Sequence, residues 1–262
     1  MTDPLFIDVG EGADRRKIAI RRRPGRGPEL VWMGGFRSDM LATKASHLDE
    51  WGGAQGRAVT RFDYSGHGES GGRFEDGTIS RWLEEALAVV ETRLEHRPLL
   101  VGSSMGGWLA LLAARRLAGT RNAPVGLVLI APAADFTEEL MWAQFPEAVK
   151  SEILEKGAWM RPSAYSPEPY PITRALIEDG RRNIILGTAY SPGCPVHILQ
   201  GMDDPDVPWS HAMRLMEHLA SDDVAMTLIK DGDHRLSRPQ DLAKLVEAIE
   251  GIAPAQLELL ER

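Results

Sequence analysis

The amino-acid sequence predicts an α/β fold with a mostly parallel central sheet, helices on both faces and a small helical cap. Short apolar runs that suit fully buried strands alternate with segments of helical apolar spacing, which is typical of parallel sheets. The alternation stops over one internal stretch, and this interruption predicts the cap. The chain has 262 residues, enough for one domain of this kind with a small insertion.

Each expected strand is an apolar run, and each expected helix repeats its apolar residues every three or four positions. The helical pattern is clear for Ile79, Leu83 and Leu87, and Thr78 suits the N-cap of that helix. The expected strands, in chain order, are residues 5–9, 17–23, 30–33, 58–62, 99–101, 125–130, 194–200 and 224–229. The expected helices are residues 43–52, 78–95, 107 onward, 210–220 and 239–252.

Residues 135–190 are expected to form the cap, inserted between two parts of the core, residues 1–134 and 191–262. No convincing strand pattern is visible in the cap, and Pro146 is expected to interrupt its first helical pattern. The two helical patterns there cover residues 137–157 and 173–181.

Large apolar residues are frequent in the expected cap. Trp142, Phe145 and Trp159 could line an acyl or other apolar substrate pocket. They could equally serve only to attach the cap to the core. The sequence favours neither interpretation.

The sequence G-S-S-M-G at residues 102–106 lies between an expected strand and an expected helix. A strand, a G-x-S-x-G turn and a helix together form the nucleophile elbow of α/β-hydrolases. The register selects Ser104 rather than Ser103 as the nucleophile. Gly102 and Gly106 are expected because a Cβ at either position would crowd the neighbouring strand or helix. The alternative is a strand-to-helix turn with no chemical role.

Two backbone N–H groups are candidates for an oxyanion hole. Met105 follows the expected nucleophile, and Phe36 follows the Gly34–Gly35 pair at the end of a central strand. In α/β-hydrolases the two donors come from these two places. The alternative is that Gly34 and Gly35 only form a turn.

Three carboxylates crowd the loop after the strand at 194–200. The pattern G-x-x-D-x-x-V selects Asp204 as the acid of a triad, with Asp203 and Asp206 as alternatives. Clustered carboxylates also bind Ca²⁺ or Mg²⁺. We do not expect a metal site, because no spaced cation-binding pattern is present.

His234 follows the last expected strand, which is where this fold carries its catalytic base. The chain order Ser104, Asp204, His234 is the α/β-hydrolase order. His67 precedes the nucleophile strand, so we interpret it as a structural loop residue that is hydrogen-bonded to the backbone.

The composition excludes some classes of function. The net charge is −8, which argues against a nucleic-acid partner, because phosphate binding needs a basic face. The densest basic cluster comprises Arg15, Arg16, Arg21, Arg22 and Arg23, and we interpret it as the solvated face of an edge hairpin.

No apolar run suits a membrane span, and no signal peptide is visible, so we expect a soluble, cytoplasmic protein. The single cysteine, Cys194, excludes an intrachain disulfide.

Several segments spread over nearly the whole chain carry a family resemblance: residues 61–66, 101–104, 106–109, 156–157, 159, 162–163, 201–202, 207–209 and 233–235. In these segments the chain resembles the α/β-hydrolase-domain depalmitoylases, a group of palmitoyl-protein thioesterases and acyl-glucuronide esterases with bacterial relatives. The resemblance implies that Ser104 is the nucleophile, Asp204 the acid and His234 the base.

The sequence thus predicts a serine hydrolase that cleaves acyl esters or thioesters through an acyl-enzyme, without a cofactor. Its substrate would be a small molecule or an acylated protein, and the sequence makes no prediction about oligomeric state. The alternatives are a general carboxylesterase or peptidase of the same fold, or a catalytically silent binding protein.

Overall fold

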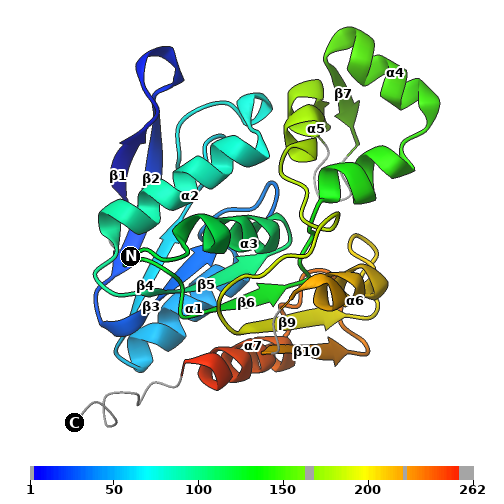
Figure 1. Cartoon of the computed structure of the whole chain (residues 1–262). Coiled ribbons are helices and arrows are strands. Elements are labelled where there is room, and N and C mark those ends of the chain that lie inside the picture. Colours follow the sequence, from blue (N-terminus) through cyan, green and yellow to red (C-terminus); the bar gives the residue numbers. More distant parts are fainter. Residues whose placement is uncertain (1–2, 163–167, 221–222, 254–262) are drawn as a thin grey trace.

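The computed structural model describes residues 3–162, 168–220 and 223–253 (Figure 1). Residue 163, which is part of the resemblance, lies outside the described part. An eight-stranded sheet forms the centre, in the order β1-β2-β4-β3-β5-β6-β9-β10. The strands are β1 (Leu5–Val9), β2 (Arg16–Arg23), β3 (Arg26–Met33), β4 (Arg57–Phe62), β5 (Pro98–Ser103), β6 (Gly126–Ile130), β9 (Val196–Gly201) and β10 (Val224–Ile229).

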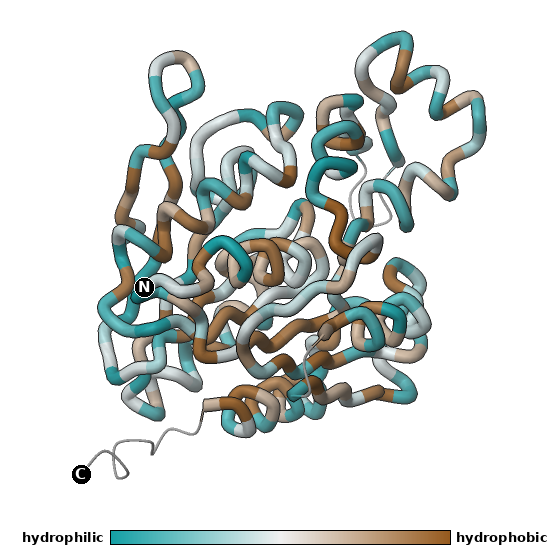
Figure 2. The backbone as a smooth tube through the Cα atoms, in the orientation of Figure 1, coloured by the Kyte–Doolittle hydropathy of each residue, from teal (hydrophilic) through white to brown (hydrophobic). Residues whose placement is uncertain are grey.

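The predicted mostly parallel sheet is confirmed. Only β2 pairs antiparallel, with β1 on one side and β4 on the other; the remaining neighbours in the sheet are parallel. The central strands β5 and β6 are almost entirely apolar, and Figure 2 shows hydrophobic backbone in the middle of the molecule. Such strands are buried on both faces, which is why they appear in the sequence as continuous runs rather than alternating ones.

Helices cover both faces of the sheet (Figure 1). Leu99 and Val101 of β5 pack on the face covered by α1 and α7, whereas Leu100 packs on the face of α2, α3 and α6. The helices are α1 (Thr43–Ala54), α2 (Ile79–Arg93), α3 (Met105–Leu117), α6 (Trp209–His218) and α7 (Pro239–Ile252), with short 3₁₀ turns η1 (Gly12–Asp14) and η2 (Phe74–Asp76). All five helices lie where the sequence predicts them, within two residues at most ends.

The stretch expected to be a cap adds no strand to the main sheet among the residues described. The expectation that it holds no strand is wrong, because β7 and β8 form a small antiparallel sheet. Each strand has only four residues, and one includes Pro171, so neither shows a strand pattern. The elements here are η3 (Thr137–Met141), η4 (Trp142–Gln144), α4 (Glu147–Lys156), β7 (Ala158–Arg161), β8 (Tyr170–Thr173) and α5 (Arg174–Arg181). The division into cap and core stays a prediction.

Both ends of this stretch are tied together at Asp135. Its buried carboxylate accepts the N–H groups of Ile185, at 2.9 Å, and Leu186, at 2.8 Å. Burial raises the pKa of Asp135, and the two N–H donors only partly offset that effect. The same stretch contacts the core where Ser80 N donates to Asp179 at 2.7 Å.

The β1–β2 hairpin lies at the edge of the sheet, as expected, but the interpretation of its arginines as a solvated face is wrong for Arg16, Arg21 and Arg22. Their side chains are only 1%, 11% and 15% exposed. Arg16 pairs with the fully buried Glu85 of α2 at 2.5 Å, and Arg22 pairs with the buried Glu29 at 2.9 Å. These arginines therefore connect elements of the fold, whereas Arg15 remains exposed.

Candidate active site

Ser104 lies in the sharp turn between β5 and α3, with φ 54° and ψ −117°. This is a strained conformation for a residue other than glycine. The glycines around it are required by close contacts. A Cβ on Gly102 would lie 2.3 Å from the carbonyl oxygen of Gly106, and one on Gly106 would lie 2.0 Å from that of Met33. The turn can therefore hold Ser104 at the carboxyl edge of the sheet only with glycine at both positions.

His234 joins Ser104 to Asp204 through hydrogen bonds. Its Nδ1 lies 2.8 Å from Oδ2 of Asp204, and its Nε2 lies 3.1 Å from Oγ of Ser104. The carboxylate can only accept, so Nδ1 carries the proton and the Nε2 lone pair faces the hydroxyl group. The side chain of Asp204 is fully buried, and that of His234 is 21% exposed. The histidine can therefore accept the serine proton while its other nitrogen stays bound to the carboxylate.

Backbone donors hold Asp204 in the loop after β9. Its Oδ1 accepts the N–H groups of Asp206 and Val207, each at 2.8 Å. Burial raises the pKa of Asp204, but the His234 hydrogen bond and these N–H groups outweigh it and leave the pKa below its ordinary value. Asp203 and Asp206 are both exposed. Of the three carboxylates in this loop, Asp204 is the one hydrogen-bonded to His234.

Gln200, at the end of β9, supports the same carboxylate and was missed in the sequence. Its side-chain nitrogen lies 2.9 Å from Gly201 O, 3.0 Å from Val207 O and 3.3 Å from Asp204 Oδ2. All three neighbours are acceptors, which fixes the amide with its nitrogen toward them. The sequence did hold one indication of this role. Gln200 is a polar residue at the end of an apolar strand, just before the acidic loop.

The predicted oxyanion donors flank Ser104. Met105 is the first residue of α3, so its N–H has no partner within the helix. Gly35 packs against Ser104, because a Cβ on it would lie 3.3 Å from the serine Cβ. Phe36 follows directly. In the described part of the chain, neither the Met105 nor the Phe36 N–H has an acceptor among the backbone hydrogen bonds outside helices and strands.

Asp204, Asp206 and His234 form the one metal-competent cluster found among the described residues, with ligand atoms within 4.8 Å of one another. Two of these three residues are already joined by the 2.8 Å hydrogen bond. A cation would have to displace the proton on Nδ1. The arrangement of these three residues therefore gives no support for a bound metal ion beyond the presence of several carboxylates in one loop.

Comparison with known proteins decides the family. A model of the alpha/beta hydrolase family matches residues 25–245. The chain belongs to the alpha/beta hydrolase family. As a member of that family with thioesterase relatives, the chain is a hydrolase. The predicted α/β-hydrolase fold is therefore confirmed.

Two groups of relatives resemble this hydrolase over most of its length. It is 34% identical over 240 residues to the mitochondrial palmitoyl-protein thioesterase ABHD10 of Homo sapiens, covering 91% of this chain and 77% of that protein. It is 51% identical to the crystal structure of a putative hydrolase from Agrobacterium vitis S4, with a TM-score of 0.92, covering 95% and 98% of the two chains. The mouse alpha/beta hydrolase domain-containing protein 10 gives 31% identity and a TM-score of 0.85, covering 96% and 98%.

The relatives named thioesterases are also named mitochondrial, whereas a cytoplasmic location was expected for this hydrolase. The location therefore stays a prediction. None of the helices within the described residues is long and apolar enough to cross a bilayer.

The three aromatic residues predicted for the pocket contact side chains of the stretch expected to be a cap. Phe145 and Trp159 meet edge to face at 5.3 Å, and Arg181 lies 4.8 Å from the ring of Trp142. Within the described residues, their ring and cation contacts are all with other cap side chains. A role for Trp142, Phe145 and Trp159 in a substrate pocket stays a prediction.

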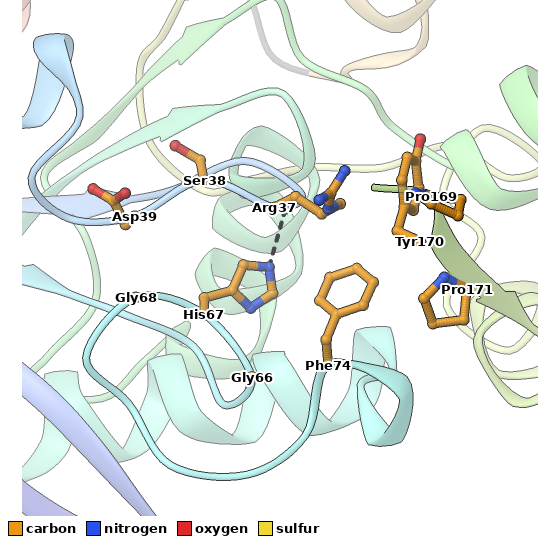
Figure 3. Close-up of a pocket in the computed structure, with 10 residues that line it drawn as sticks. All are labelled: Arg37, Ser38, Asp39, Gly66, His67, Gly68, Phe74, Pro169, Tyr170 and Pro171. Carbon is orange, nitrogen blue, oxygen red and sulfur yellow. Dashed lines mark hydrogen bonds between the residues drawn. The ribbon is translucent and has the colours of Figure 1, made fainter. Parts of the chain in front are cut away.

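A cavity of about 310 Å³ lies between the core and β8 of the hydrolase, and it does not include the Ser104–His234–Asp204 cluster (Figure 3). Its lining residues are Arg37, Ser38, Asp39, Gly66, His67, Gly68, Phe74, Pro169, Tyr170 and Pro171. The expectation for His67 is confirmed, because both ring nitrogens contact backbone groups, Arg37 N and Ser65 O, each at 3.1 Å.

Lys44 of α1 reaches the loop that carries His234, a contact that the sequence did not suggest. Its Nζ donates to the carbonyl oxygen of Arg235. Burial lowers the pKa of Lys44 to about 8, and nearby Asp233 only partly offsets this. The loop is thus anchored to a helix almost 200 positions earlier in the chain.

Proposed function

We propose that this hydrolase cleaves acyl esters or thioesters, with Ser104 as nucleophile, His234 as base and Asp204 as acid. The observation that carries the proposal is the continuous hydrogen-bond path from Asp204 through His234 to the strained Ser104. As Ser104 Oγ attacks the acyl carbonyl carbon, its proton moves to His234 Nε2. Asp204 stabilises the imidazolium, and the N–H groups of Met105 and Phe36 bind the oxyanion.

The attack gives a tetrahedral intermediate that carries the oxyanion. Its collapse breaks the bond between the acyl carbon and the leaving oxygen or sulfur. His234 returns its proton to that atom, which leaves as an alcohol or thiol. Water then loses a proton to His234 and attacks the acyl-Ser104 ester, and the carboxylic acid is released as Ser104 recovers the proton. Every proton is carried by His234, so the cycle needs only water as a co-reactant.

Relatives named palmitoyl-protein thioesterases support a long acyl chain as the substrate group. Trp142, Phe145 and Trp159 would then contact that chain, as apolar and aromatic linings usually do. The substrate would be an acylated protein or a smaller thioester. A carboxylesterase or peptidase would use the same three residues, and a panel of acyl thioesters, short p-nitrophenyl esters and peptide amides separates these activities.

Labelling with a fluorophosphonate probe tests the proposed nucleophile. We expect the wild-type protein to be labelled, and Ser104→Ala and His234→Ala to lose at least about a hundredfold in labelling rate, because the nucleophile or its base is missing. The matched control is Ser103→Ala, which removes the neighbouring hydroxyl group and should keep the label.

Labelling that survives in Ser104→Ala would contradict the proposed nucleophile. A folded wild-type protein that neither reacts with the probe nor hydrolyses any member of the substrate panel would contradict the proposed chemistry as a whole. Circular dichroism of each variant establishes that the fold is retained.

A further inference from the structure

The proposed oxyanion donor Phe36 lies in a four-residue turn. Ser38 N donates to Gly35 O at 3.1 Å, and Arg37, the third residue, has φ 59°. A positive φ at the third position is the pattern of a type II turn, where glycine is the usual residue. Arginine there is strained, so the turn needs support from its surroundings.

His67 provides that support from the opposite loop. Its Nδ1–H donates to Ser65 O, and its Nε2 accepts the N–H of Arg37, each at 3.1 Å (Figure 3). His67 is 5% exposed, and its ring packs edge-on against Phe74 and Trp82. Burial lowers the pKa of His67 to about 4, so the ring is neutral at neutral pH and Nε2 stays an acceptor.

The contact fixes the peptide that joins Phe36 to Arg37. Type I and type II turns differ by a rotation of this central peptide, and a bound Arg37 N–H favours the orientation that the structure has. The other side of the turn is covered from β8, where Tyr170 lies 4.3 Å from the Arg37 guanidinium and 6.0 Å from the Phe36 ring. The turn is therefore held from two directions.

The same turn carries the oxyanion donor. The Gly35 carbonyl and the Phe36 N–H belong to one planar peptide, so the Ser38 bond that closes the turn also orients this N–H. If the strained turn opened and lost the Ser38–Gly35 bond, the donor would therefore move. An oxyanion hole requires its donors within a few tenths of an ångström of hydrogen-bond distance.

We propose that His67 is a positioning residue that holds the turn of residues 35–38 and thereby fixes the Phe36 N–H toward the oxyanion. This role rests on the proposed serine mechanism. His67 does not touch the reacting atoms. It acts through Arg37, and its effect belongs to the transition state rather than to substrate binding.

Two carboxamide substitutions test the two nitrogens of His67 separately. In His67→Gln the side-chain oxygen replaces Nε2, so the acceptor for Arg37 N–H remains and the donor to Ser65 is lost. In His67→Asn the side-chain nitrogen replaces Nδ1, so the donor remains and the acceptor is lost. Both variants replace the same buried ring with a carboxamide, and they differ from each other by one methylene group.

With a p-nitrophenyl ester, we expect His67→Asn to lower kcat about ten- to a hundredfold while KM changes less than about threefold. His67→Gln should keep kcat within about threefold of the wild type. Adding Arg37→Gly to His67→Asn should recover part of kcat, because glycine adopts a positive φ without strain. Thermal unfolding of all three variants establishes their relative stability.

Equal kcat values for His67→Asn and His67→Gln would overturn the role of His67, as would a loss confined to KM. Failure of Arg37→Gly to raise kcat in the His67→Asn background would also count against it. Ser104→Ala is measured alongside. Activity that persists in Ser104→Ala would overturn the serine mechanism itself, whereas Ser104-dependent activity with indistinguishable His67 variants would overturn only the positioning role.

Discussion

At the scale of single residues, the candidate site extends beyond the three residues joined by hydrogen bonds. Gln200 donates to the same Asp204 oxygen that accepts from His234, and Lys44 donates to the loop next to that histidine. Because the pKa of Asp204 is lowered, its carboxylate stays charged at any pH above its ordinary value of 3.8. We expect these neighbours to keep the histidine in one orientation.

The lowered pKa of Lys44, about 8, predicts a pH-dependent stability. Between pH 8 and the ordinary lysine pKa of 10.5, the unfolded chain binds more protons than the folded one, so the free energy of unfolding rises with pH. Lys44→Met lacks this group. We therefore expect it to be more stable than the wild type at neutral pH, with the difference shrinking over that range.

Urea unfolding at a series of pH values measures the difference. Lys230 is exposed, so Lys230→Met is the control. Its difference in stability from the wild type should stay the same over this pH range. A difference between Lys44→Met and the wild type that is constant across the same pH range would contradict the prediction.

The sequence predicted those site residues that spacing and chain order define. The G-x-x-D-x-x-V pattern distinguished Asp204 from its two acidic neighbours, and the order along the chain distinguished His234 from the other histidines. Lys44 and Gln200 carry no such pattern. Lys44 meets Arg235 only after folding brings α1 beside the last loop, so no local spacing announces the contact.

At the scale of secondary structure, a strand was predictable where both of its faces are buried, because its residues are then almost all apolar. Strands β5, β6 and β9 are apolar runs and were located within two residues. Strands β7 and β8 are short and partly exposed, so packing between them rather than their composition defines them. Strand β2 was located, but the burial of Arg16 was not, because its partner Glu85 lies 69 positions away.

The Arg16–Glu85 pair joins β2 to α2, and its removal should destabilise the fold. Arg16→Met removes the cation 2.5 Å from the fully buried Glu85 carboxylate and leaves only Arg81, at 3.9 Å. Loss of one partner of a buried pair typically costs about 3–5 kcal/mol. Adding Glu85→Gln should recover part of the loss, because the amide oxygen can still accept the Ser65 N–H that Glu85 accepts now. Urea unfolding measures both variants.

Arg15→Met is the matched control on the neighbouring residue. The Arg15 side chain is 62% exposed and its ion pair with Asp8 is solvated, so the change should stay within about 1 kcal/mol. If Arg16→Met proved no more destabilising than Arg15→Met, the buried pair would not connect these elements as described.

At the scale of the whole molecule, the candidate site residues all lie at one edge of the sheet. Phe36, Ser104, Asp204 and His234 follow β3, β5, β9 and β10, whose carboxyl ends meet there. This is where parallel α/β sheets bind their ligands. Core clusters on both faces hold the strands, so the loops that carry the site start from fixed positions.

The hydrogen bonds of Asp135 should stabilise the attachment of residues 136–185 to the rest of the fold. Asp135→Ala removes the acceptor of two buried N–H groups and puts alanine at φ 54°, so we expect a loss of about 1–3 kcal/mol. Asp135→Asn retains an acceptor and tolerates this φ, so it should lose less. Limited proteolysis should cut Asp135→Ala fastest between residues 136 and 185. Equal cleavage rates in all three proteins would contradict this.

Because Asp135 contacts Ile185 and Leu186, the segment between residues 136 and 184 begins and ends at two neighbouring points of the chain. Chain between two adjacent anchor points can be lengthened, shortened or replaced without changing the register of any strand in the main sheet. This stretch can therefore change in evolution while the loops that carry the candidate site stay the same. Related sequences should accordingly diverge in length and composition between these anchors far more than in the loops after β5, β9 and β10.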